Sequence, residues 1–298
     1  MSPRGWILFL AMSIIWGIPY LLIKVAVEGV SVPVLVLART AVGAAVLLPL
    51  AFSRQTVTMV RNHWKALLGF ALFEIIAAWW LLSDAERHLT SSMTGLIIAA
   101  APIIAAVLDR FTGGERLGYK RIIGLGIGMC GVAVLAGPHI GGSTWPIIEV
   151  LMVATCYAIA PLIAARYLAD VPTLPMTAVC LGFAALVYAA PAAATWPDEM
   201  PSTSVLLALA GLAVICTALA FIVFFALIRE VGAARALVFT YINPAVALAA
   251  GVIVLNEPLT LWNVAALTLI MAGCVLATRR HTEEEPDIAT EPTSVAPR

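Results

Sequence analysis

The chain has 298 residues, of which 62% are hydrophobic and 11% are charged, and its mean hydropathy is +1.02. Because a soluble domain carries about 25% charged residues, this composition excludes a soluble globular protein and predicts one that spans a membrane. The 17 Lys and Arg residues balance 17 Asp and Glu residues. Since no basic stripe interrupts this balance, the sequence predicts no nucleic-acid partner.

Apolar runs separated by Pro, Gly or charged residues predict ten transmembrane helices. Each run is long enough to cross about 30 Å of hydrocarbon at about 1.5 Å per residue, and the alternating pattern of a membrane β-barrel is absent. The predicted fold class is therefore an all-α integral membrane protein. The ten runs cover residues 5–27, 32–52, 64–84, 90–108, 120–137, 145–166, 174–195, 204–228, 233–255 and 260–278.

The two ends of the chain and its cations predict the orientation. Residues 1–4 form a short N-terminus, and the acidic tail 279–298 lacks the apolar content to fold, so we expect it to be disordered. Most Lys and Arg residues fall on the side of the N-terminus, whereas only Lys24 and Arg87 fall on the opposite side. The positive-inside rule then predicts a multi-pass protein of the bacterial plasma (inner) membrane with both termini cytoplasmic.

An internal repeat emerges when the chain is aligned with itself at an offset of 142 residues. The offset aligns Pro19 with Pro161 and Pro102 with Pro244, and it also aligns acidic, basic and glycine positions. Residues 5–137 and 145–278 would each hold five helices, an odd number, so the second copy would enter the membrane from the opposite face. Such an inverted repeat is typical of carriers that work by alternating access, and a duplicated scaffold or channel is the alternative.

Several short motifs follow one another in the first half, and the last of them recurs in the second half. They are Trp16-Gly17 followed by Lys24, Arg39, the segment from Ala101-Pro102 to Gly114-Glu115-Arg116, and the segment from Asn243-Pro244 to Asn256-Glu257-Pro258. In these residues the chain resembles the EamA-type permeases of the drug/metabolite transporter superfamily. The resemblance implies a ten-helix transporter with a central cavity shared between the halves, and usually export or exchange of small metabolites. Ala158-Ile159 replaces the Trp-Gly pair in the second copy, and Asn256 stands where the family often has Gly.

Two charged residues fall inside predicted spans. Glu74 lies near the middle of the third run, where an ionised acid costs about 2.5–3.5 kcal/mol. It is either a proton-coupling or cation-binding acid that faces the cavity, or a protonated acid bonded to a neighbouring helix. Arg39 cannot lose its charge and must meet an acid, a carbonyl or a substrate anion, so bracing of helix ends and substrate binding both stay open.

Other charges fall at helix ends. Lys24 with Glu28, and Arg166 with Asp170, are spaced i,i+4, which predicts helix-end ion pairs or gating charges. Glu115 and Glu257 precede the fifth and tenth helices. We expect both to cap those helices, because carboxylates favour a helix N-terminus.

Aromatic residues and helix breakers define the candidate binding residues. An aromatic-lined cavity suits flat, partly apolar or cationic solutes. Pro102 and Pro244 are expected to interrupt their helices and to expose carbonyl groups. The predicted substrate-binding residues are Trp16, Tyr20, Glu74, Trp79, Tyr157, Tyr241 and Asn243.

The sequence predicts neither an enzyme nor a cofactor or metal site. No catalytic triad, zinc-protease motif or ATP-binding loop is present, and the five cysteines fall in apolar runs without metal-ligand spacing. The series Gly126-x-Gly128-x-x-Gly131 lies in the fifth run without a preceding strand, so together with Gly124 it predicts a close contact between helices.

The predicted function is secondary transport: export or exchange of small organic metabolites, such as amino acids or drug-like solutes, by alternating access. The driving force would be the gradient of the solute or protons taken up through Glu74. A passive facilitator or channel for small solutes is the alternative. The expected partners are a small-molecule metabolite and the lipid bilayer, and the protein would be a monomer or a homodimer.

Overall fold

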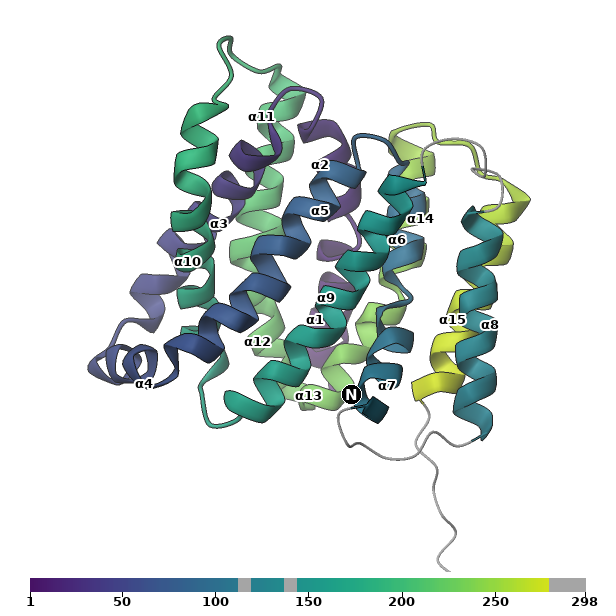
Figure 1. The fold of residues 1–298 in the computed structure, drawn as a ribbon, viewed down its shortest axis with the longest axis horizontal. Helices are drawn as coiled ribbons and strands as arrows, with labels where there is room; N and C mark the ends of the chain where they lie inside the picture. The colour runs from purple at the N-terminus through teal and green to yellow at the C-terminus, as the bar shows by residue number, and fades with distance from the viewer. Residues whose placement is uncertain (112–118, 137–143, 279–298) are drawn as a thin grey trace, which may run out of the picture.

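The structure is a computed structural model that describes residues 1–111, 119–136 and 144–278. In this part of the chain the regular elements are helices that pack side by side (Figure 1). We name the two ends of the bundle the upper face and the lower face, after their positions in Figure 1. The upper face holds residues 27–31, 86–90, 195–202 and 255–260, and the lower face holds the N-terminus and residues 52–53, 168–172 and 232.

The described residues of the first half form eight α-helices and one π-helical segment. They are α1 (Pro3–Ile15), α2 (Pro19–Ala26), α3 (Val32–Ala51), α4 (Arg54–Ala71), the π-helix η1 (Leu72–Ile76), α5 (Ala77–Ala85), α6 (Ser91–Ile98), α7 (Ala101–Phe111) and α8 (Tyr119–Ala136).

The second half repeats this pattern with different breaks. Its elements are α9 (Trp145–Tyr167), α10 (Thr173–Ala194), α11 (Thr203–Ala210), the π-helix η3 (Gly211–Leu219), α12 (Ala220–Val231), α13 (Ala233–Ala236), the 3-10 helix η4 (Leu237–Tyr241), α14 (Asn243–Val254) and α15 (Leu261–Thr278).

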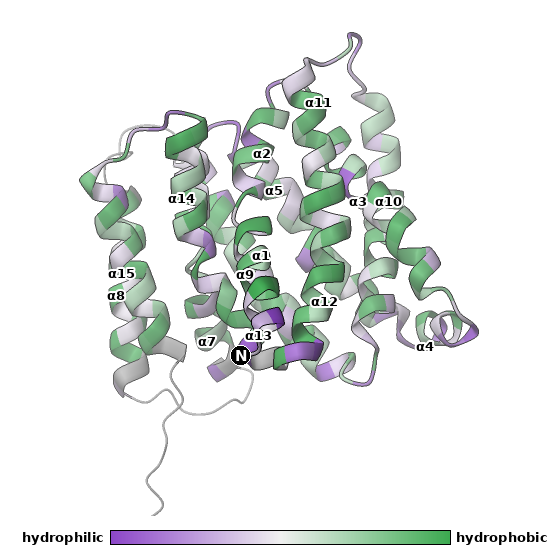
Figure 2. Ribbon diagram, turned by 180° about the vertical axis from the view of Figure 1, so that it is seen from behind, coloured by the Kyte–Doolittle hydropathy of each residue, from purple (hydrophilic) through white to green (hydrophobic). Residues whose placement is uncertain are grey.

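Seven helical segments in the described residues are long and apolar enough to cross a membrane. Three shorter apolar helices, Ile122–Leu135, Asn243–Val254 and Leu261–Leu276, occupy the other predicted runs. Large apolar side chains cover the outer surface of the bundle. Leu186 and Ile253, for example, are each 76% exposed. Figure 2 shows the hydrophobic residues along the helices and the hydrophilic ones mainly at their ends. The fold is therefore an all-helical membrane bundle, and the count of ten spans stays a prediction.

The predicted runs match the helices to within three residues at each end, with one exception. The third run was predicted to begin at residue 64, but α4 begins at Arg54, after the N-cap Ser53, whose Oγ accepts a hydrogen bond from the Thr56 amide at 3.1 Å. Hydropathy misses the first turns of α4 because they are largely polar. N-capping explains why the helix nonetheless starts there.

Helix discontinuities fall before prolines. Pro19 lacks an amide proton and its ring clashes with the preceding turn, so α1 ends at Ile15 and α2 begins at Pro19. The fourth and ninth runs are interrupted next to Pro102 and Pro244, as expected: each proline occupies the second position of a helix, α7 or α14, that follows a break. The first helical turn tolerates proline because its amides have no partner within the helix.

Two kinds of discontinuity recur at the 142-residue offset. The break between α6 and α7, at residues 99–100, corresponds to residues 241–242, which are the last residue of η4 and the turn before α14. The π-helix η1 corresponds to residues 214–218, which lie within η3. The break before Pro19 has no counterpart, because α9 continues through Pro161.

Helices of the two halves also pack against each other. α3 packs against its equivalent α10 and α8 against its equivalent α15, while α6 packs against α14, which is the equivalent of α7. α1 contacts α12 while α2 contacts α11, so these two broken helices run antiparallel.

The contact between α8 and α15 depends on glycine. A Cβ atom added at Gly273 would overlap the backbone of Gly128 and would lie 2.7 Å from the carbonyl oxygen of Gly124. The predicted small-residue contact surface is therefore confirmed for Gly124 and Gly128, since the two backbones touch. Gly126, on the same helix, faces open space, and a Cβ there meets no described atom within 4 Å.

Gly273→Ala is expected to lower the thermal stability of the protein, because the backbone of Gly128 cannot move aside as a flexible side chain can. Overpacking of this kind costs about 1–3 kcal/mol. Gly126→Ala is the matched control and should leave the melting temperature in detergent unchanged or higher. Equal melting temperatures for the two variants would contradict the close contact.

Candidate functional site

Arg39 lies on α3 in the interior of the bundle. Its side chain is buried, with 4% of the residue exposed. The guanidinium carbon sits 3.8 Å from the centre of the Trp79 ring, and Nε donates a hydrogen bond to Thr217 Oγ1 at 3.4 Å. Its Nη1 has no hydrogen-bond partner among the described residues. A permanent positive charge with one unpartnered nitrogen thus faces the centre of the protein.

Three other predicted residues, Tyr20, Trp79 and Tyr157, lie around Arg39, and Glu74 lies near Tyr157. Tyr157 of α9 lies within electrostatic range of Arg39, Tyr20 and Glu74, and Trp79 faces its hydroxyl group. Tyr20, Glu74 and Tyr157 are half-buried, whereas Trp79 is buried. We call Tyr20, Arg39, Glu74, Trp79 and Tyr157 the central cluster. It joins α2, α3, η1, α5 and α9, and therefore both halves of the chain.

The two π-helices shape the surroundings of the cluster. Glu74 lies in η1, and its repeat-mate Cys216 lies in η3 close to Arg39. The next residue, Thr217, donates its hydroxyl proton to the Leu212 carbonyl oxygen at 2.8 Å, so its oxygen can accept the hydrogen bond from Arg39. Sequence reasoning missed Thr217, because a threonine in an apolar run carries no signal until the π-helix turns it toward a charge.

Two other predicted binding residues, Trp16 and Asn243, lie outside this cluster. Trp16 packs in a separate aromatic group, with ring centroids 5.1 Å from Phe224 and 5.5 Å from Phe239. The side chain of Asn243 links α1 to the η4–α14 break. When its amide nitrogen is turned toward the carbonyl oxygens of Phe239 and Ser13, it lies 3.2 Å from each. Tyr241 is half-buried against the main hydrophobic core. Substrate binding by these residues stays a prediction.

Lys24 does not form the predicted ion pair with Glu28. Its Nζ donates hydrogen bonds to the backbone carbonyl oxygens of Glu86, at 2.7 Å, and Leu89, at 2.8 Å, while Glu28 is exposed. The carbonyl groups that follow α5 have no partner in that helix, so they compete for the ammonium group. Lys24 thereby ties α2 to the 86–89 segment at the upper face.

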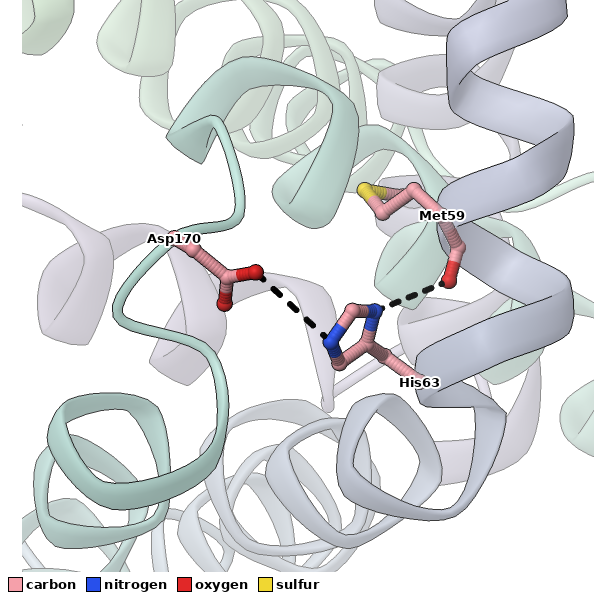
Figure 3. A network of polar contacts seen from close by, with 3 residues as sticks. All are labelled: Met59, His63 and Asp170. Carbon is pink, nitrogen blue, oxygen red and sulfur yellow. Dashed lines mark hydrogen bonds and ion pairs between the residues drawn. The ribbon is translucent and has the colours of Figure 1, made fainter.

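The second predicted pair, Arg166 with Asp170, is also absent. Arg166 is exposed and lies 5.7 Å from the centre of the Tyr167 ring. Asp170 instead approaches His63, with 3.9 Å between Oδ2 and Nε2, and the His63 Nδ1 lies 3.3 Å from the Met59 carbonyl oxygen (Figure 3). Since His63 belongs to α4, this contact joins the first half of the chain to the loop after α9.

Glu257 caps a helix other than the one predicted. Its carboxylate accepts hydrogen bonds from the backbone amides of Ser91, at 2.7 Å, and Ser92, at 3.0 Å, and from both serine hydroxyl groups. The capped helix is therefore α6 of the first half, and not α15. A carboxylate at a helix N-terminus is stabilised by unpaired amides and by the helix dipole. The repeat-mate Glu115 and the acidic tail lie outside the described residues.

Glu86 is a buried acid that sequence reasoning did not select. It follows α5 directly, one residue beyond the apolar span Arg54–Ala85, and is 0% exposed. No described residue donates a hydrogen bond to either carboxyl oxygen. Burial raises the pKa of the Glu86 carboxyl well above its ordinary value, and the nearby Lys24 ammonium opposes this shift.

The fold and these contacts define a class: a helical membrane protein with a charged, aromatic centre built from both halves of the chain. Comparison with known proteins narrows the class. The profile of the EamA-like transporter family matches residues 3–137 and again residues 144–279, so the chain belongs to this family. It is a membrane transporter and not an enzyme.

Individual relatives agree with this assignment. The chain is 25% identical to the uncharacterized transporter YvbV of Bacillus subtilis, over 95% of this chain and 94% of that one. It is 28% identical to the uncharacterized inner membrane transporter YedA of Escherichia coli K12, over 90% and 88%. A protein of known crystal structure matches with a TM-score of 0.65 at 20% identity, over 93% of this chain and 98% of that chain, which shows a shared fold.

Glu257→Gln is expected to destabilise the protein by about 1–3 kcal/mol, because hydrogen bonds to a charged group contribute about that much and the amide replaces one acceptor oxygen by a donor. Glu28→Gln removes an exposed carboxylate from the same face and serves as control. Thermal unfolding in detergent measures both. If Glu257→Gln unfolded at the temperature of the control, the cap on α6 would contribute nothing to stability.

Proposed function

We propose that the protein is a secondary transporter that exports or exchanges small organic metabolites by alternating access. The observation that carries this proposal is the central cluster: a buried Arg39 with an unpartnered nitrogen, surrounded by residues of both halves. A charge deep in a membrane bundle is expensive and marks a substrate or ion pathway. Carriers commonly form such sites where helices are broken.

We further infer ten spans arranged as two inverted five-helix repeats, residues 5–137 and 145–278. The recurring break at residues 99–100 and 241–242 and the paired π-helices support this arrangement. The antiparallel contacts of α1 with α12 and of α2 with α11 also support it. In such an architecture the two halves can exchange conformations, so that one mouth of the central site opens as the other closes.

The charge distribution supports an orientation with the lower face in the cytoplasm. Arg54, Arg166 and Arg229 lie toward the lower face, whereas Lys24 and Arg87 lie toward the upper face. By the positive-inside rule, both termini would be cytoplasmic and the upper face would be outside the cell. An inner-membrane location follows by analogy with YedA.

The contacts at the two faces differ in a way that alternating access explains. At the upper face Lys24 and Glu257 hold the 86–92 segment from both sides. The residues equivalent to Lys24, Glu86 and Leu89 are Arg166, Ile228 and Val231, and at the lower face Arg166 is exposed. The Ile228 carbonyl oxygen there accepts from the Gly232 amide at 2.8 Å. We interpret this state as closed toward the outside, with the equivalent inner contact unmade.

The cluster also indicates how a solute would be held. The free nitrogen of Arg39 can donate to an acidic group of the solute, while Trp79, Tyr157 and Tyr20 offer ring surfaces. Glu74 would bind a proton or a cationic group on the other side of Tyr157. Amino acids and drug-like solutes both fit this description.

Counterflow in proteoliposomes tests the transporter. Vesicles preloaded with a panel of amino acids, organic acids and cationic aromatics should accelerate uptake of the labelled solute of one class. Arg39→Gln should weaken binding of that solute about tenfold or more, since a hydrogen bond to a charged group contributes about 1.5–3 kcal/mol. Arg61→Gln, an exposed cation, is the control. Uptake without acceleration by internal solute would indicate a passive facilitator or channel.

Proton coupling through Glu74 predicts a specific change in pH dependence. In the wild type the rate of solute exchange should vary with pH, because the carboxyl must release and bind a proton during the cycle. Glu74→Gln should abolish this variation while the protein still binds solute, and Glu199→Gln, an exposed acid of the upper face, should retain it. A pH profile unchanged in Glu74→Gln would leave the solute gradient as the driving force.

A further inference from the structure

Glu86 combines two features that conflict in an apolar protein interior. Its carboxyl group is fully buried, and neither oxygen has a hydrogen-bond partner among the described residues. Burying an ionised carboxylate without hydrogen bonds is among the most expensive arrangements in a protein, so such a group binds a proton instead. The central cluster and the predicted binding residues leave Glu86 without a role.

The charged and titratable groups that face Glu86 come from each neighbouring element. α2 contributes the Lys24 ammonium and the Tyr20 phenol, and the segment after α14 contributes the Glu257 carboxylate. α6 contributes the Thr94 hydroxyl, which donates its proton to the Thr90 carbonyl oxygen at 3.1 Å.

The acid and the base nearest in sequence to Glu86, Asp84 and Arg87, form an ion pair with each other. Asp84, near the end of α5, pairs with Arg87 in the turn that follows, at 3.5 Å between Oδ1 and Nη1, and both side chains are partly exposed. This leaves Lys24 as the one described cation that faces Glu86.

The hydrogen bonds of Lys24 tie the protonation of Glu86 to the closure of the upper face. The Lys24 ammonium has three protons, and two of its hydrogen bonds go to the carbonyl oxygens of Glu86 and Leu89. A neutral Glu86 carboxyl does not compete for this ammonium group. An ionised one would, because a charge-assisted hydrogen bond to a carboxylate is about twice as strong as one to a neutral acceptor.

We propose that Glu86 is a proton-binding site of the outer gate: the protonated carboxyl lets Lys24 hold the 86–89 segment closed, and deprotonation draws Lys24 away and opens it. The proton passes between the carboxyl oxygen and water at the upper face. Glu257 adds to the effect. An ionised Glu86 would repel the Glu257 carboxylate and so weaken its contact with the N-terminus of α6. The inference rests on the proposed function in naming this segment a gate, whereas the proton site itself does not depend on it.

The site would give the outside pH a direct effect on the transport cycle. Acid outside would protonate Glu86 whenever the upper face is open, and would thereby favour its closure. An inward proton gradient would then bias the carrier toward the state open to the cytoplasm, which is the state that an exporter must regain after releasing solute.

The first measurement is infrared spectroscopy of the full-length protein in lipid nanodiscs between acid and alkaline pH. The carbonyl stretching band of a buried carboxylic acid should be present in the wild type at neutral pH. It should weaken in Glu86→Gln and stay unchanged in Glu28→Gln, which removes an exposed acid of the same face. A band unaffected by Glu86→Gln would overturn the proposal.

The second measurement is hydrogen exchange of the amides in residues 86–94, corrected for the intrinsic effect of pH. Opening linked to the loss of one proton should increase exchange by up to about tenfold per pH unit. Glu86→Gln, which mimics the protonated acid, should exchange slowly at every pH. Exchange in the wild type that is independent of pH, or that depends on pH equally in Glu86→Gln, would overturn the proposal.

If Glu86→Gln does not fold, Glu86→Asp provides the test, because its shorter side chain keeps the carboxyl but changes its distance from Lys24. The pH midpoint of exchange should then shift, and an unshifted midpoint would count against the proposal. Neither readout needs a transported solute. Absence of counterflow together with a pH-linked carboxyl band would therefore refute the alternating-access carrier and leave the proton site. Counterflow without such a band would support the carrier and refute the proton site.

Discussion

Arg39 keeps its positive charge in the interior of an apolar bundle, because a guanidinium group cannot be deprotonated in a protein. The surrounding structure must therefore solvate a fixed cation without water. It does so with the face of Trp79 and the hydroxyl of Thr217, and it offers no described carboxylate as an ion-pair partner. The solvation is incomplete at one nitrogen. The centre is thus prepared for an additional acceptor, and a transported solute can supply it.

The helix irregularities make this solvation possible. In a lipid environment each backbone polar group needs a partner within the protein, so a regular helix has no spare groups to offer. A π-helix shifts its hydrogen bonds by one residue and changes the direction of its side chains. In η3 this places Thr217 between the Leu212 carbonyl and Arg39, and in η1 it places Glu74 near Tyr157. The irregular segments therefore coincide with the charged residues.

Sequence reasoning predicted what depends on local pattern and missed what depends on distant contacts. Hydropathy located the helices because the bilayer selects for length and apolarity, and it failed at Arg54–His63 where a polar helix needs only a cap. The burial cost of charge singled out Arg39 and Glu74. It did not single out Glu86, which follows an apolar run and looks like a surface residue. The partners of Lys24 and Glu257 lie 62 to 166 positions away, and spacing within one helix favoured nearer ones that the structure does not use.

The charged residues also make the two repeats chemically unequal. The first repeat carries Arg39, Glu74 and Glu86, whereas the 142-residue offset places Leu181, Cys216 and Ile228 at the equivalent positions. In the proposed alternating-access cycle, the shared backbone architecture would make the two end states similar in energy. The charges would then decide between them, because a proton on Glu86 or a solute on Arg39 acts on charged residues that only the first repeat carries. Symmetry of the fold would permit the exchange of states, and asymmetry of the charges would make that exchange respond to protons and to solute.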